Sequence, residues 1–91
     1  MPQIRAEVRV TGRVQGVWFR QSTKDTAERY GVKGWVRNNP DRSVEAVFEG
    51  EENTVQDIVA WCRNGPELAL VADVQLEWKT STGEFTDFRI C

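Results

Sequence analysis

The sequence predicts a two-layer α+β sandwich, in which two helices cover one face of an antiparallel sheet. Three observations lead to this fold. Segments in which apolar and polar residues alternate occur before and after two segments whose apolar residues have helical spacing. Glycine and proline separate these segments. The 91 residues, 40% of them apolar, suffice for one thin hydrophobic core, so we expect a single domain over residues 1–91.

The first predicted strand leads through a loop into a helix. Residues 3–11 alternate between apolar and polar side chains, as in a half-buried strand. The loop over residues 12–20 contains two glycines and has no clear period, and a helix over residues 21–30 follows it. Gly31 is a natural C-cap and ends this helix.

A β-hairpin is predicted next, with strands over residues 32–39 and 43–49. In the second of these strands the alternation places Glu45, Val47 and Glu49 on the outer face of the sheet. The outer face is therefore expected to be rich in acidic residues.

The remaining residues predict a second helix and two strands. Acidic residues at the start of the segment 51–62 suit a helix N-terminus, and Gly65 follows its last apolar residue. Residues 72–79 alternate like a strand, and a short strand covers residues 88–90. The order is βαββαβ with a further C-terminal strand, which is the order of a ferredoxin-like sandwich.

Composition excludes several classes of protein. The chain has no histidine and two cysteines, so a His-based catalytic triad, an imidazole-ligated metal, a zinc set and a disulfide framework are excluded. Cys62 lies on the apolar stripe of the second helix, where we expect a buried, unreactive thiol. The longest apolar run, residues 68–72, is far below the ~20 residues of a membrane-spanning helix. We therefore expect a soluble, cytoplasmic protein that binds no membrane.

Charge is unevenly distributed along the chain. Residues 1–37 hold eight basic and three acidic residues, whereas residues 38–91 hold four basic and eleven acidic residues. A bound anion should therefore meet the first part, and a small anion suits this net acidic chain better than a nucleic acid. The alternative is that the charges only scatter over a solvated surface.

The loop over residues 12–20 is the best candidate for a binding site because it joins a strand to a helix. Backbone N–H groups at a helix start have no intrahelical partner, and a curled glycine-containing loop makes a nest for an anion. Arg20 adds a planar guanidinium that can hold two phosphate oxygens. The alternative is a tight turn in which Val14, Val17 and Phe19 pack into the core.

Two motifs at a fixed separation extend this interpretation. The sequence is GRVQGVWFR at residues 12–20 and GWVRN at residues 34–38, and a VExxxEG strand, a Gly-Pro turn and a closing FxI follow. With these motifs the chain resembles the acylphosphatase family over essentially its whole length. The resemblance implies a ferredoxin-like enzyme that hydrolyses the mixed anhydride of a carboxylic acid and phosphate, without a metal or a cofactor.

The resemblance also implies roles for individual residues. Arg20 binds the phosphate, and Asn38 positions the attacking water. The preceding loop residues cradle the phosphate with main-chain N–H groups, and they are Arg13, Val14, Gln15, Gly16, Val17, Trp18 and Phe19. The partner is then a small acyl phosphate, with inorganic phosphate or sulfate as competing anions, and we expect a monomer that binds no nucleic acid.

The residues themselves are also compatible with hydrolysis of an acyl phosphate. An acyl phosphate is already activated, so positioning and charge stabilisation suffice to hydrolyse it. No Ser, Thr, Cys, Asp or Glu lies between Gly12 and Arg20, which favours direct attack by water over a covalent intermediate. Asn38 can orient a water molecule while remaining a poor base, but it could instead cap the hairpin.

Three residues depart from the family pattern. Arg42 stands where many members have glycine; because an arginine at positive φ costs roughly 1–2 kcal/mol, we expect a different type of turn. Asn39 replaces the Thr or Leu expected after Asn38. Trp18 stands where small or medium residues are common, and it either walls the acyl side of the site or covers the edge of the core.

Two other functions fit a fold of this kind. An RNA-binding module of the same topology stacks bases on aromatic side chains of its central strands, but residues 43–49 present acidic residues there. A regulatory or interaction domain could keep an acylphosphatase-like fold without activity, but intact Arg20 and Asn38 favour the enzyme.

Overall fold

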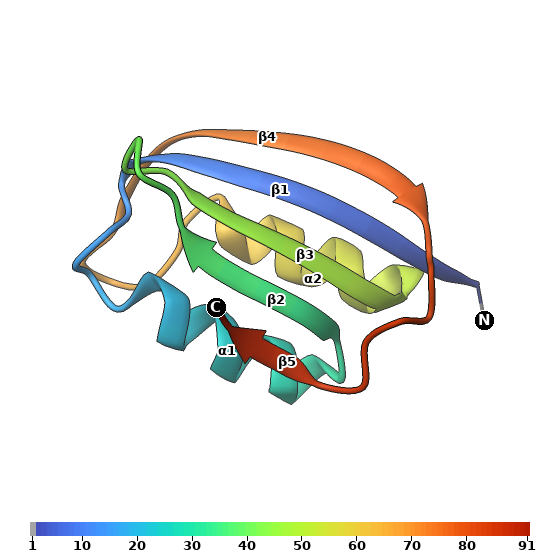
Figure 1. Cartoon of the computed structure of the whole chain (residues 1–91). Helices are drawn as coiled ribbons and strands as arrows, with labels where there is room; N and C mark the ends of the chain where they lie inside the picture. Colours follow the sequence, from blue (N-terminus) through green and yellow to red (C-terminus); the bar gives the residue numbers. More distant parts are fainter. Residues whose placement is uncertain (1) are drawn as a thin grey trace.

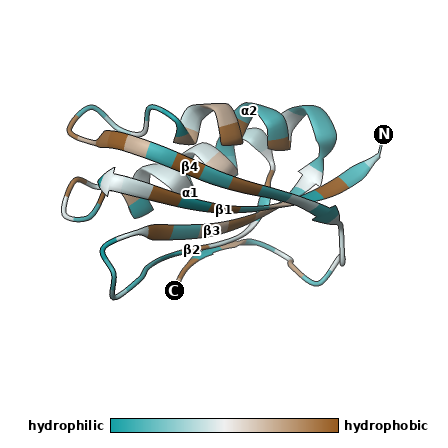
Figure 2. Cartoon of the chain, turned by 90° about the horizontal axis from the view of Figure 1, so that it is seen from above, coloured by the Kyte–Doolittle hydropathy of each residue, from teal (hydrophilic) through white to brown (hydrophobic). Residues whose placement is uncertain are grey.

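Residues 2–91 of the computed structural model are described here, and Met1 lies outside them. A five-stranded sheet carries two helices on one of its faces (Figures 1 and 2). The elements are β1 (Gln3–Arg13), α1 (Phe19–Tyr30), β2 (Lys33–Asn38), β3 (Val44–Glu51), α2 (Glu52–Cys62), β4 (Leu70–Thr80) and β5 (Phe88–Ile90). The predicted ferredoxin-like sandwich is confirmed.

The strands lie in the order β4-β1-β3-β2-β5. All neighbouring pairs are antiparallel except β2 and β5, which run in parallel. The sheet is therefore mixed, where the sequence predicted an antiparallel one. Since β2 and β5 point the same way, the last residue of β5 lies near the end of β2, where Asn38 is found.

The hydrophobic core lies between the sheet and the helices. Alternate residues of β1 are buried opposite alternate residues of β3, so that Val8 faces Ala46 and Ala6 faces Phe48. Helix α2 packs over these strands with the apolar stripe predicted for it, namely Val55, Ile58, Val59 and Cys62. Burial raises the pKa of the Cys62 thiol to about 12, so this group stays protonated and unreactive.

Helix α1 begins two residues earlier than predicted. Trp18 takes the left-handed conformation, with φ of 66°, and the helix starts directly after it. Phe19 is buried, and its ring centroid lies 5.6 Å from that of Trp61 on α2. This aromatic contact fixes the first turn of α1 against the second helix.

The turn of the β2–β3 hairpin contradicts the expectation for Arg42, which has a positive φ of 75°. The Arg42 N–H donates to the Asn39 oxygen, and the Asn39 N–H donates to the Ser43 oxygen. This is a turn closed by a left-handed residue, for which Pro40 suits the first central position. The Asp41 carboxylate accepts from the Ser43 N–H at 3.0 Å and so offsets part of the backbone strain.

Val47 and Glu49 lie on the outer face of β3 as predicted, but they are buried there and not open to solvent. The segment that joins β4 to β5 crosses the sheet from one edge to the other (Figure 1). Glu49 accepts hydrogen bonds from the N–H groups of Thr82 and Gly83, at 3.1 and 3.0 Å, and from Arg5 at 2.9 Å. The alternation of apolar and polar residues within one strand cannot indicate that a segment distant in the sequence packs against its outer face.

Candidate active site

A cavity of about 430 Å³ opens between the β1–α1 loop (residues 14–18), the first turn of α1 and the adjoining ends of β2 and β5. It brings together residues that are far apart in the sequence. The lining residues are Val14, Gly16, Trp18, Phe19, Arg20, Gln21, Asn38 and Ile90.

The entry into the loop is set by Gly12. This residue has a φ of 121° at a shift in the β1–β4 register. A Cβ atom here would lie 2.3 Å from the backbone oxygen of Leu70, so only glycine lets β1 continue beside β4. The bulge directs the chain out of the sheet and into the loop.

The loop itself has the backbone conformation of an anion nest. Gly16 and Trp18 both have positive φ, at 74° and 66°, and Val17 between them does not. Such alternation turns successive N–H groups toward one point. Within residues 2–91, no protein acceptor binds the N–H groups of residues 15–21.

The start of α1 strengthens the attraction for an anion. No side chain caps this end of the helix, and its first turn contains no acidic residue. The positive end of the helix dipole therefore faces the cavity without a compensating carboxylate. A bound phosphate would supply the missing acceptors.

Arg20 projects from this first turn and lines the cavity. Arg5, Arg9 and Arg37 are paired with acidic side chains on the outer face of the sheet. In the described part of the chain, by contrast, the Arg20 guanidinium has no hydrogen-bonded or ion-paired partner. It is thus available to an anion in the cavity.

Asn38 ends β2 on the opposite side of the cavity. Its side-chain oxygen is buried and, among residues 2–91, accepts no hydrogen bond. A buried acceptor without a donor is costly, and it is satisfied when a polar group enters the site. The neighbouring Asn39 caps the hairpin instead, since its amide nitrogen lies 3.1 Å from Ser43 Oγ.

Gln15 connects the two sides of the cavity. Its side-chain amide donates to the backbone oxygens of Asn39 and Ser43, both at 2.9 Å. Ser43 in turn receives a hydrogen bond from Arg9 Nε at 3.2 Å, and its hydroxyl lies 2.6 Å from the Asp41 carboxylate. The loop is thereby fastened to the hairpin segment that follows Asn38.

The structure brings most of the predicted site residues together, but some of their side chains line the cavity and others are buried in the core. Gly16, Trp18, Arg20 and Asn38 line the cavity. The side chains of Val14, Val17 and Phe19 are buried in the core, as the tight-turn alternative proposed, while the loop backbone stays open to the cavity. Arg13 is exposed and is not among the lining residues.

Sequence reasoning missed two lining residues, Gln21 and Ile90. Gln21 was placed in the helix, and only its position directly after Arg20 could have indicated it. Ile90 carries no local signal, because the parallel pairing of β5 with β2 brings it to the cavity.

No helix within residues 2–91 has the length and apolar character needed to span a membrane. In the same residues, no three His, Cys, Asp or Glu side chains lie close enough together to hold a metal ion.

Fold and cavity together define a small α+β domain in which loop N–H groups without acceptors among residues 2–91 border a cavity. The sequence model of the family described as Acylphosphatase matches residues 6–90. An acylphosphatase from Pelotomaculum thermopropionicum is 51% identical over 99% of this chain and 98% of its own length. An acylphosphatase from Nostoc sp. is 59% identical over 88% of this chain and 79% of its own length.

Comparison with solved structures agrees with this result. The crystal structure of acylphosphatase from Bacillus subtilis superposes with a TM-score of 0.93 at 34% identity, over 97% of this chain and 98% of that one. The chain belongs to the acylphosphatase family, and the resemblance seen in its motifs is confirmed. Its activity is accordingly the hydrolysis of acyl phosphates to a carboxylate and inorganic phosphate.

Proposed function

We propose that the chain hydrolyses acyl phosphates by direct attack of water on phosphorus, with Arg20 and the β1–α1 loop holding the phosphate and Asn38 positioning the water. One observation carries this proposal: the N–H groups of residues 15–21 have no acceptor among the described residues and surround the start of α1. An oxyanion with several oxygen atoms suits such a set of donors.

The phosphate group binds first in this mechanism. Its oxygens accept hydrogen bonds from the loop N–H groups, and the Arg20 guanidinium holds two of them. These donors are fixed by the fold before the substrate arrives, so they need no reorganisation as charge moves in the transition state. Gln15 supports this arrangement because it fastens the loop to the hairpin.

Water then attacks opposite the acyl oxygen. The Asn38 side-chain oxygen accepts a hydrogen bond from the water and orients it toward phosphorus. The bond from phosphorus to the acyl oxygen breaks as the bond to the water oxygen forms, and the carboxylate leaves with the bonding pair. A phosphate oxygen takes the proton of the water, so the products are a carboxylate and inorganic phosphate.

Neither a metal nor a covalent intermediate is part of this mechanism. The carboxylate is a good leaving group, so no Lewis acid is needed to expel it. The loop between Gly12 and Arg20 offers no nucleophilic side chain, and Cys62 is buried in the core and is not among the lining residues. Positioning and charge stabilisation are sufficient for an activated anhydride.

We further propose that residues 1–91 act as a single-domain monomer in the cytoplasm and bind no nucleic acid. Basic side chains on the outer face of the sheet are matched by acidic ones, as in the pairs Arg37–Glu45 and Lys79–Glu7. A free buried thiol at Cys62 is compatible with a reducing compartment.

The test is release of phosphate from benzoyl phosphate by the purified chain, with and without excess EDTA. We expect turnover that EDTA leaves unchanged and that millimolar inorganic phosphate or sulfate inhibits competitively. Activity that is lost with EDTA and restored by a metal would refute the metal-free mechanism. Absence of turnover in a correctly folded sample would refute the assigned reaction.

A further inference from the structure

We propose that Trp18 and Ile90 bind the acyl group of the substrate and give the enzyme a preference for large apolar acyl groups over acetyl. The proposal deepens the function proposed above and rests on it. It concerns the mouth of the cavity, where these two side chains are found together.

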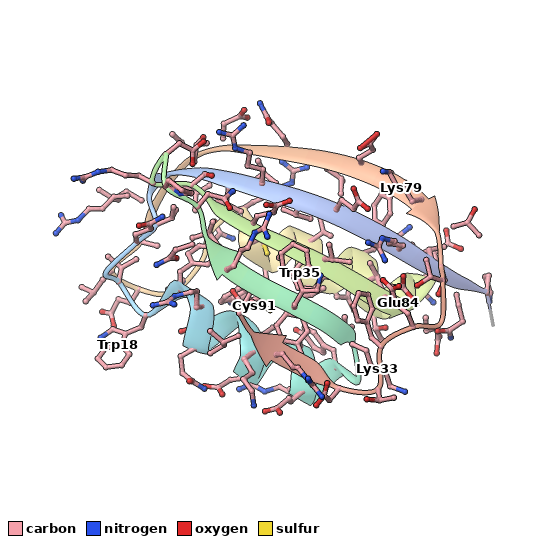
Figure 3. The ribbon with its side chains drawn as sticks, in the orientation of Figure 1. Trp18, Lys33, Trp35, Lys79, Glu84 and Cys91 are labelled. Atoms are coloured by element: carbon pink, nitrogen blue, oxygen red, sulfur yellow. The ribbon has the colours of Figure 1, made fainter. Side chains whose placement is uncertain are left out.

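Trp18 is 73% exposed, the largest exposed fraction among the large apolar residues described. Figure 3 shows its ring projecting from the ribbon at the loop before α1. A side chain this exposed does not cover the edge of the core. Of the two roles that the sequence left open, only the one at the acyl side of the site is compatible with this exposure.

The backbone at Trp18 is unusual in a way that a packing role does not explain. A bulky residue rarely adopts a left-handed conformation, which glycine takes without strain. Trp18 nevertheless has a φ of 66°, at the point where the anion nest meets α1. Strained residues of this kind gather at ligand sites, where the surrounding structure holds them in place.

Ile90 provides a second apolar side chain on the same cavity. It is 38% exposed and belongs to β5, next to Val36 of β2. Ile90 and Trp18 come from opposite ends of the chain, and the fold places both around the cavity that Gly16, Arg20 and Asn38 also line. The lining therefore combines polar groups that suit a phosphate with two exposed apolar side chains at the rim, Trp18 and Ile90.

An acyl phosphate has the same division into two parts. When its phosphate lies in the nest, the acyl group is attached through a single oxygen and must extend from the nest toward the rim. An aromatic or long apolar acyl group then contacts the Trp18 ring and the Ile90 side chain, whereas an acetyl group is too short to cover them. Contact between the Trp18 ring and an aromatic acyl group should raise kcat/KM for the larger substrate by roughly fivefold.

The proposal is tested by the ratio of kcat/KM for benzoyl phosphate to kcat/KM for acetyl phosphate. We expect Trp18→Ala to lower this ratio about fivefold, Ile90→Ala to lower it about twofold or more, and Trp18→Phe to retain most of it. Trp78→Ala is the matched control, because Trp78 is 46% exposed on β4 and is not among the lining residues. That variant should keep the wild-type ratio.

A second measurement avoids turnover altogether. Phenylphosphonate and methylphosphonate carry a phosphate-like head but cannot be hydrolysed, so calorimetry can compare their affinities in each variant. Wild type should bind phenylphosphonate more tightly, and Trp18→Ala and Ile90→Ala should reduce that difference while inorganic phosphate still binds. The proposal is overturned if both alanine variants keep the wild-type ratio of substrates and the wild-type difference between phosphonates. Failure of the wild type to hydrolyse either substrate would instead refute the reaction.

Discussion

The side-chain amide nitrogen of Gln15 lies 2.9 Å from the backbone oxygen of Asn39. The two residues belong to the opposite sides of the cavity, since Gln15 is in the β1–α1 loop and Asn39 directly follows Asn38. A second hydrogen bond of the same amide to the Ser43 oxygen makes the connection rigid. The loop proposed to hold the phosphate and the residue proposed to position the water are thereby kept at a fixed separation.

Replacing Gln15 should therefore impair catalysis although its side chain does not line the cavity. We expect Gln15→Ala to lower kcat by about tenfold or more, because small displacements of reacting groups are costly. It should also lower the free energy of unfolding by about 1–3 kcal/mol, since two hydrogen bonds to backbone oxygens are lost. Kinetics and urea denaturation measure both effects. Gln56→Ala is the control, and equal behaviour of the two variants would contradict this role.

The predicted role of Arg20 depends on the shape of its guanidinium. Arg20→Lys keeps the charge but loses the two parallel hydrogen bonds. The ratio of kcat/KM for benzoyl phosphate between wild type and variant should therefore correspond to a loss of more than about 2 kcal/mol of transition-state stabilisation. Inhibition by inorganic phosphate should weaken in parallel. Arg29→Lys, in the last turn of the same helix, should leave both quantities unchanged. Near-normal kcat/KM in a folded Arg20→Lys would show that Arg20 does not bind the phosphate.

Asn38 and Asn39 are neighbours with different expected roles, and alanine variants of the two should separate these roles. Asn38→Ala should lower kcat by about 100-fold while inhibition by phosphate is nearly unchanged, because the attacking water loses its orienting group. Asn39→Ala should instead lower the unfolding free energy by about 1 kcal/mol and retain kcat, because its side chain bonds to Ser43. If the two variants exchange these patterns, Asn38 is a hairpin cap and the mechanism is wrong.

Glu49 should make stability depend on acid pH. Burial alone would raise the pKa of its carboxyl, but the Arg5 guanidinium and the N–H groups of Thr82 and Gly83 outweigh burial and lower the pKa to about 2. A carboxyl with a depressed pKa stabilises the fold above its unfolded pKa and loses that contribution as the pH falls. We expect most of this contribution, about 3 kcal/mol of unfolding free energy in total, to be lost between about pH 5 and pH 2.

The measurement is urea denaturation of wild type and Glu49→Gln over this pH range. The variant should be less stable at pH 7, and the difference should shrink toward pH 2, where about half of the wild-type Glu49 carboxyls are protonated. Glu45→Gln removes a partly exposed partner of Arg37 and should cost less than about 1 kcal/mol at any pH. If the difference in unfolding free energy between wild type and Glu49→Gln does not change with pH, the ionised Glu49 carboxylate does not stabilise the fold in this way.

The two cysteines should be dispensable for turnover. Cys62 is buried in the core and Cys91 is exposed, and neither lines the cavity. The double variant Cys62→Ala, Cys91→Ser should keep kcat, while the cavity left at Cys62 should lower the unfolding free energy by about 1–2 kcal/mol. Loss of turnover in the folded double variant would indicate a thiol intermediate.

Features that depend on neighbours in the sequence were predictable. Alternation located the strands, because one side of each strand faces the core, and the spacing of Val55, Ile58 and Val59 located α2. The loop motif located Arg20, and the hairpin motif located Asn38. Periodicity and short motifs involve only residues close together in the sequence, so one sequence is enough to detect them.

Features that depend on distant contacts were not predictable. Val47 and Glu49 follow the alternation of an exposed strand face, but both are buried, and Glu49 is hydrogen-bonded by the segment between β4 and β5. Arg42 adopts a positive φ because the turn and the Asp41 carboxylate hold it there. Ile90 reaches the cavity only through the parallel pairing of β5 with β2.

The parallel pairing of β5 with β2 also sets the order in which this enzyme can become active during synthesis. Residues 2–80 contain all four antiparallel strands and both helices, so they can collapse around the core while the last strand is still unmade. Pairing of β1 with β4 must come late, since it joins distant parts of the chain, and β5 comes later still. Ile90 therefore joins the lining of the cavity only after β5 has left the ribosome and paired with β2. If Ile90 has the proposed role, a nascent chain without β5 lacks part of the surface that would bind the acyl group.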